Sequence, residues 1–163
     1  MAESIEITDE MRAAVGRQSD PWPYEVTTTG IRSFARGVGY TDPVYFDAAA
    51  AADAGYDALP APVCYLGTPM YLPGRSNERF STPVFSRRGL GHGLKDVLDG
   101  GTDTVYERPL RAGDELTART AVVDLEVKQS KALGAFLLVT SETVFTDDAG
   151  LVAARQRSQA IFY

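Results

Sequence analysis

The chain has 163 residues, 44% of them hydrophobic and 23% charged, and its formal net charge is −6. This length suits one domain, 1–163, with a core that needs neither a disulfide nor a metal. The acidic balance argues against a nucleic-acid partner, and the longest apolar run, 135–139, is too short for a membrane span.

The first 20 residues form a polar N-terminal extension without the apolar core of a secretory signal. The chain has one cysteine, Cys64, which excludes an intrachain disulfide and favours a reducing compartment. We therefore expect a cytoplasmic protein. Within the extension, Thr8 to Val15 predicts a short helix, and Tyr24 to Thr29 predicts an extended segment because its threonines suit a strand.

Two helices are predicted next. Ile31 to Val38 places its apolar residues three and four positions apart, which is typical of an amphipathic helix, and Gly39 ends it. Asp47 is the expected cap of a second, alanine-rich helix over Ala48 to Ala54.

The middle of the chain is less regular. Val63 to Leu72 is apolar, and residues 73–101 form a loop-rich insertion. The insertion contains the largest group of positive side chains in the protein, namely Arg75, Arg79, Arg87, Arg88 and Lys95. The group fits either a solvated loop or a surface for an anionic ligand or partner.

The last third predicts strands over Thr102 to Glu107, Glu115 to Lys128, Ala135 to Thr146 and Leu151 to Tyr163. Leu116, Ala118, Thr120 and Val122 alternate with more polar residues, as in a strand buried on one face. Residues 136–139 are apolar on both faces, as in a central strand. Early helices followed by antiparallel strands predict an α+β fold.

Three stretches resemble the MaoC-like dehydratase family, and most closely its FAS1-like type. They are IRSFARGVGYTDPVYFD at 31–47, AADAGYDALPAP at 51–62, and the RP-x-x-x-GD-x-L pattern at 108–116. The resemblance implies a hot-dog fold, in which an antiparallel sheet of about five strands wraps a central helix that begins near Pro62. It also implies dimers joined edge to edge, with an acyl-CoA or acyl-carrier-protein thioester bound between the subunits.

The departures from the family pattern bear on catalysis. Tyr40 stands where active members carry the catalytic Asp, Asp42 where they carry Asn, and Tyr45 where they carry His. Hydration of an enoyl thioester needs an acid–base pair near neutral pH, and tyrosine titrates near pH 10. The chain's one histidine, His92, lies outside the motif between two glycines, where we expect it to be mobile.

Each candidate residue has two interpretations. Asp42 is either a turn residue or a displaced catalytic carboxylate, and Tyr40 and Tyr45 either fill the former site or orient a ligand. Cys64 is either a buried, inert thiol or a reactive one at a helix N-terminus. The positions that the resemblance assigns to substrate binding are Pro43, Pro62, Val63, Cys64 and Gly67. No His, Cys and Asp cluster suggests a metal, and we expect no cofactor.

Three functions remain open at this point. The first is a non-catalytic subunit of a heteromeric (R)-3-hydroxyacyl-thioester dehydratase or enoyl-CoA hydratase, which completes the acyl tunnel beside a catalytic MaoC-like partner. The second is a stand-alone enzyme with a repurposed pocket. The third is a homodimer that binds an acyl ligand without turnover.

Overall fold

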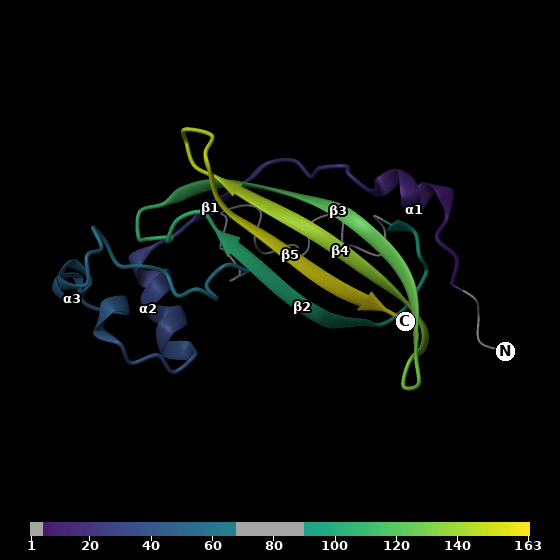
Figure 1. Ribbon diagram of the computed structural model, residues 1–163, viewed down its shortest axis with the longest axis horizontal. Coiled ribbons are helices and arrows are strands. Elements are labelled where there is room, and N and C mark those ends of the chain that lie inside the picture. Colours follow the sequence, from purple (N-terminus) through teal and green to yellow (C-terminus); the bar gives the residue numbers. More distant parts are fainter. Residues whose placement is uncertain (1–4, 68–89) are drawn as a thin grey trace.

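The structure is a computed structural model, and it describes residues 5–67 and 90–163. Its strands form one antiparallel sheet in the order β1-β3-β4-β5-β2 (Figure 1). The strands are β1 (Trp22–Glu25), β2 (Val97–Tyr106), β3 (Glu115–Ser130), β4 (Gly134–Thr146) and β5 (Val152–Phe162). The helices are α1 (Asp9–Ala14), α2 (Thr28–Gly37), the 3-10 helix η1 (Pro43–Tyr45) and α3 (Ala48–Asp53). This confirms the predicted α+β class and the sheet of about five strands.

The hydrophobic pattern of the two long strands is confirmed. In β3, Leu116, Ala118, Thr120 and Val122 are all buried, while most of the residues between them are exposed. In β4, residues 137–139 are buried on both faces, because β4 lies in the middle of the sheet. The Thr120 hydroxyl is satisfied across the ladder by the Thr143 hydroxyl at 2.8 Å.

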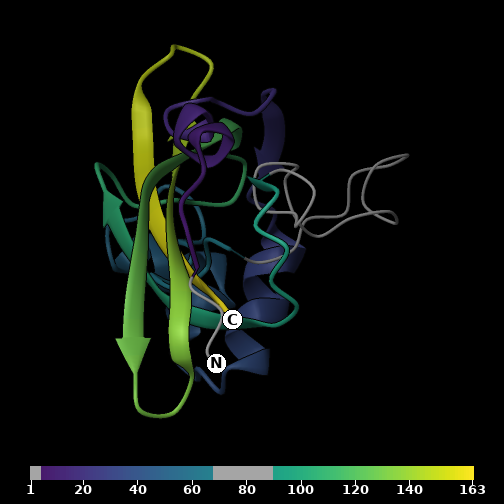
Figure 2. The ribbon, with the colours of Figure 1, turned by 90° about the vertical axis from the view of Figure 1, so that its right-hand side faces the viewer.

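The core has two clusters. One joins α2 to the sheet through Ile31, Tyr24, Tyr65 and Phe145, and the other packs Met11 of α1 and Leu90 against β3, β4 and β5. Figure 1 shows the corresponding separation, with α2 and α3 beyond one end of the sheet and α1 near the other. Figure 2 shows the sheet from its end. None of the helices in the described ranges is long and apolar enough to cross a membrane.

Two boundaries differ from the sequence prediction. The extended segment expected over Tyr24 to Thr29 is wrong in its second half, because the Thr27 hydroxyl accepts a hydrogen bond from the Gly30 N–H at 3.0 Å and so caps α2. Strand β2 begins at Val97, five residues before the expected Thr102. Gly100 stands at a bulge in β2, and a Cβ there would lie only 3.0 Å from the Gln159 Cβ.

The helix expected to begin near Pro62 is absent from the described part of that segment. Residues 62–67 form turns: the Tyr65 N–H donates to the Pro62 carbonyl at 2.8 Å, and Gly67 has a φ of +92°. This backbone conformation does not continue a right-handed helix. Residues 68–72 of the predicted helix lie outside the described ranges, as do most of the loop-rich insertion and its four arginines.

Candidate functional site

The end of α2 places Tyr40. The Gly39 N–H donates to the Arg36 carbonyl at 3.2 Å and the Tyr40 N–H to the Ala35 carbonyl at 2.8 Å. These two bonds form a Schellman motif, which requires the left-handed conformation that Gly39 adopts with a φ of +80°. Gly39 therefore ends the helix and sets the position of the tyrosine that follows.

Replacing Gly39 with Ala is expected to lower the free energy of unfolding by about 1–2 kcal/mol, because a Cβ penalises the left-handed conformation. Gly37 is the matched control: it is the last helical residue, and a Cβ there meets no atom within 4 Å. Gly37→Ala should raise stability by about 0.5–1 kcal/mol through helix propensity. Urea unfolding of both variants measures the difference, and equal effects would contradict the assigned role of Gly39.

The segment after α2 contains two further helices, η1 and α3, each capped by an aspartate, and α3 ends in the same way as α2. The Asp42 carboxylate accepts the Val44 N–H at 3.0 Å and caps η1, and Asp47 caps α3 through the Ala50 N–H at 2.9 Å. At the end of α3, Gly55 has a φ of +86° and the Tyr56 N–H donates to the Ala51 carbonyl. Helices α2 and α3 are thus each followed by a Gly-Tyr pair, and this repeated dipeptide marks Tyr56, which the sequence reasoning missed.

Tyr40, Tyr45 and Cys64 meet in space. The rings of Tyr40 and Tyr45 are stacked, with centroids 5.6 Å apart and planes at 29°. The Tyr40 hydroxyl lies 3.6 Å from the Cys64 sulfur, which comes 24 residues later in the chain. Two of the motif positions and one expected substrate-binding residue therefore share one surface, and Tyr45 also packs against the core cluster of α2.

A further tyrosine, Tyr106 at the end of β2, joins this surface. Its hydroxyl donates to the Val63 carbonyl at 2.6 Å. No local sequence pattern identifies Tyr106 as part of this surface, because the hydrogen bond joins residues that lie 43 positions apart in the chain.

The environment disfavours ionisation of all three tyrosines. The hydrogen bond with Cys64 raises the pKa of Tyr40 above its usual value. Burial raises the pKa of Tyr45, and the Asp42 charge adds to this effect. Burial is also the largest cause of the raised pKa of Tyr106. At neutral pH the three phenols are therefore protonated, and none is a ready general base.

The structure places the other expected residues as follows. Pro43 opens η1, Pro62 is fully buried, and Val63 is 74% exposed. The thiol of Cys64 is exposed, so the interpretation as a buried thiol is wrong. Cys64 lies on a turn, whereas the resemblance placed it at a helix N-terminus.

His92 is not the mobile residue expected between two glycines. Its ring packs on Phe162 with centroids 4.3 Å apart, and its Nδ1 accepts the Leu94 N–H at 3.1 Å. Phe162 belongs to the cluster with α1, whereas Tyr45 packs on the cluster with α2. The chain's histidine therefore stands apart from the motif positions.

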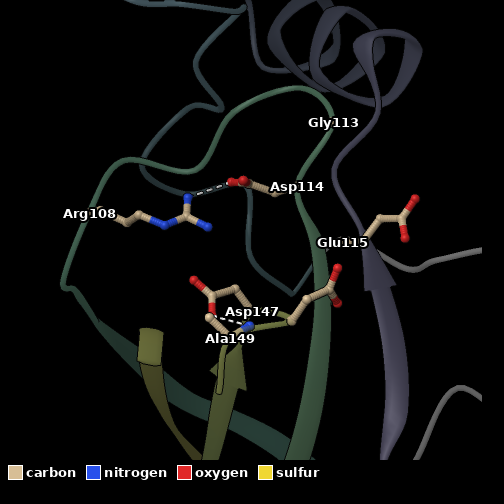
Figure 3. A pocket seen from close by; sticks show the side chains of 7 residues that line it. Arg108, Gly113, Asp114, Glu115, Asp147 and Ala149 are labelled. Atoms are coloured by element: carbon tan, nitrogen blue, oxygen red, sulfur yellow. Dashed lines mark hydrogen bonds and ion pairs between the residues drawn. The ribbon is translucent and has the colours of Figure 1, made fainter. Parts of the chain in front are cut away.

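A surface pocket of about 510 Å³ lies at the turn of the RP-x-x-x-GD-x-L pattern (Figure 3). Its lining residues are Arg108, Gly113, Asp114, Glu115, Asp147, Asp148 and Ala149. The Arg108 guanidinium donates to the Asp114 carboxylate at 2.7 Å, and the same oxygen accepts the Arg111 N–H at 2.9 Å. Asp147 accepts N–H groups of its own turn. The carboxylates of Asp114 and Asp147 therefore hold the two turns that border the pocket.

In the described part of the chain, no imidazole lies beside the tyrosine surface, which is formed by Tyr40, Tyr45, Cys64 and Tyr106. This surface offers phenols, a thiol and an exposed carboxylate that caps a turn. Among residues 5–67 and 90–163, no group of three or more His, Cys, Asp or Glu side chains is placed to hold a metal ion. The arrangement suits contact with an apolar or aromatic surface better than proton transfer.

The chain is similar to a known protein family and to known proteins over most of its length. Residues 13–156 match the family model described as FAS1-like, dehydratase domain region. A relative from Clavibacter michiganensis subsp. michiganensis, a UPF0336 protein, is 34% identical over 128 residues, which are 78% of each chain.

Solved structures agree with the fold. The C-terminally truncated HadBC (3R-hydroxyacyl-ACP dehydratase) complex from Mycobacterium tuberculosis is 25% identical with a TM-score of 0.70, and the match covers 96% of this chain and 99% of that one. A MaoC-like dehydratase is 28% identical with a TM-score of 0.72, covering 93% of this chain and 43% of that one. The expected hot-dog fold is confirmed.

Proposed function

Since this chain belongs to the FAS1-like dehydratase family, we propose that it is the supporting subunit of a heteromeric (3R)-hydroxyacyl-thioester dehydratase or enoyl-thioester hydratase. In this assignment a MaoC-like partner supplies the catalytic Asp and His. The present chain completes the dimer and lines the acyl-binding region with the surface formed by Tyr40, Tyr45 and Cys64.

The observation that carries the proposal is the pair of stacked tyrosines at the family's two catalytic positions. Their hydroxyls have raised pKa values, and neither lies beside an imidazole, because His92 packs in the other cluster. The Asp42 carboxylate accepts the Val44 N–H and caps η1 from an exposed position, which supports a turn role for Asp42 rather than a catalytic one. Likeness to a heteromeric dehydratase, the HadBC complex, supports the division of labour.

A hydration assay tests the assignment. Crotonyl-CoA and a longer enoyl-CoA are offered to the purified chain alone, to a MaoC-like chain that retains Asp and His, and to the two together. We expect no turnover by this chain alone, because acid–base groups contribute roughly 10²–10⁴ in rate. The mixture should be at least about a hundredfold faster than this chain alone and faster than the partner alone.

Turnover by this chain alone would contradict the proposal and favour the stand-alone enzyme. In that case Asp42→Ala decides whether the displaced carboxylate carries the reaction. Stabilisation of the chain by the enoyl thioester, with no turnover in any mixture, would instead indicate an acyl-binding homodimer.

A further inference from the structure

A band of polar side chains crosses the inner face of the sheet, which is the face that carries both core clusters. Its two cross-strand rows are Thr120, Thr143, Gln156 and Thr104, from β3 to β2, and then Ser141, Ser158 and Thr102. The flanking rows on this face are apolar, with Phe145 in the cluster of α2 and Val139 in the cluster of α1. The polar band therefore separates the two halves of the core.

Most of the band is paired within itself. The hydroxyls of Thr120 and Thr143 are 2.8 Å apart. The Ser141 hydroxyl donates to the Ser158 carbonyl at 3.2 Å, and the Thr102 hydroxyl donates to the Ser158 hydroxyl at 3.3 Å. These bonds account for the burial of hydroxyl groups on this face.

Gln156 is paired less completely. It is 8% exposed, and its Nε2 donates to Thr104 Oγ1 at 3.2 Å, which is the one hydrogen bond of this amide in the part of the chain that the structure describes. An amide has two N–H groups and an oxygen with two lone pairs, so Oε1 and one N–H are left over. Burying them costs free energy, which an apolar residue of the same length avoids. The amide is therefore suited to a polar group from outside the chain.

Gln156 lies beside the residues assigned to the acyl-binding region. A Cβ at Gly67 would be 3.8 Å from both Oε1 and Nε2, so the absence of a side chain at Gly67 leaves this approach to the amide uncovered. On β2, Tyr106 lies two residues from Thr104 on the same face, about 7 Å along the strand. The Tyr106 hydroxyl binds the Val63 carbonyl, next to Cys64. The polar band thus adjoins the tyrosine surface.

We propose that Gln156 and Thr104 form a specificity subsite that binds a hydroxyl group on the acyl chain of the ligand. The inference rests on the proposed function and names the class of acyl group. A hydroxyl both donates and accepts, so it pairs with Oε1 or with the remaining N–H of Gln156. The apolar rows on both sides of the band suit the rest of a hydrocarbon chain better than the amide-bearing arm of an acyl carrier.

The test compares the binding of saturated ligands by calorimetry, with this chain alone and in its complex with the MaoC-like partner. The ligands are decanoyl-CoA and hydroxydecanoyl-CoA isomers whose hydroxyl lies beyond the β-carbon, so none of them is dehydrated. At least one isomer should bind about threefold to tenfold more tightly than decanoyl-CoA. Because no turnover is read, this result is independent of the hydration assay and stands even if the chain proves active alone.

Gln156→Met should remove this preference, leave the affinity for decanoyl-CoA within about threefold, and keep or raise the urea midpoint, because Met has the same length and no amide. Gln159→Met is the matched control, since Gln159 is exposed on the opposite face of β5 and its loss should leave the preference intact. Thr104→Val serves as a second variant if Gln156→Met does not fold, because it removes the hydroxyl that holds the amide.

Three results would overturn the inference. The first is that no isomer binds more tightly than decanoyl-CoA, or that no ligand binds. The second is a Gln156→Met variant of lowered stability that still prefers the hydroxylated isomer, which would make the amide structural. The third is an equal loss of affinity for all ligands in a stable variant, which would assign the amide to the carrier arm that they share.

Discussion

Replacing Phe145 with Ala is expected to lower the free energy of unfolding by about 3–5 kcal/mol, because Phe145 is a large side chain buried in the core. Phe145 is 1% exposed, and its ring meets Tyr24 edge-on at 5.3 Å and Trp22 at 6.1 Å. Removal of the ring leaves a cavity and breaks both aromatic contacts.

Aromatic contacts connect Phe145 to the helix that carries the tyrosine surface. Tyr24 contacts Tyr65, and Tyr65 contacts Phe34 of α2 at 5.6 Å, so an aromatic chain joins β4 to the helix that places Tyr40. Urea unfolding with an unchanged m-value measures the loss. Leu151→Ala is the control, because Leu151 is 66% exposed and should change stability by less than about 0.5 kcal/mol. A loss at Phe145 below about 1.5 kcal/mol would contradict the assigned core.

Replacing Asp114 with Ala is expected to destabilise the protein by about 2–3 kcal/mol. The Asp114 side chain is 9% exposed and accepts hydrogen bonds from the Arg108 guanidinium and the Arg111 N–H through one oxygen. Hydrogen bonds to charged groups contribute about 1.5–3 kcal/mol each, and the partial exposure of Arg108 reduces its share.

Asp148→Ala provides the comparison, since Asp148 lines the same pocket and is exposed. Its effect should stay within about 0.5 kcal/mol. The loss of stability in Asp114→Asn should lie between those of Asp114→Ala and Asp148→Ala, because the amide oxygen still accepts one N–H but carries no charge. Equal losses for Asp114→Ala and Asp148→Ala would show that the Arg108–Asp114 pair contributes nothing to stability.

Local patterns predicted most of the fold. Alternation in β3 and the double-sided run in β4 follow from the period of a strand, and Gly39 and Gly55 identified where α2 and α3 end. The predicted boundaries were wrong where a distant contact or a competing local hydrogen bond determines the backbone conformation. Thr27 satisfies a helix N–H instead of extending a strand, and the close approach of β5 makes Gly100 part of β2 rather than a loop.

The candidate site was predicted in composition but not in geometry. The family resemblance identified Tyr40, Asp42 and Tyr45, and it placed Cys64 on a helix. The structure instead has Cys64 exposed on a turn beside Tyr40, and the side chain of the next residue, Tyr65, packs in the core cluster that holds α2. Contacts such as Tyr106 with Val63 join residues far apart in sequence and leave no local signal.

The most direct test of the supporting role is made in the active heteromer with Tyr40→Phe/Tyr45→Phe. This variant removes both hydroxyls and keeps both rings. Because the role assigned here needs the rings and not their protons, kcat/KM for crotonyl-CoA should stay within about threefold, whereas His→Ala in the partner should cost about a hundredfold or more. A loss of about a hundredfold in the Phe variant would contradict the account and make these tyrosines catalytic residues.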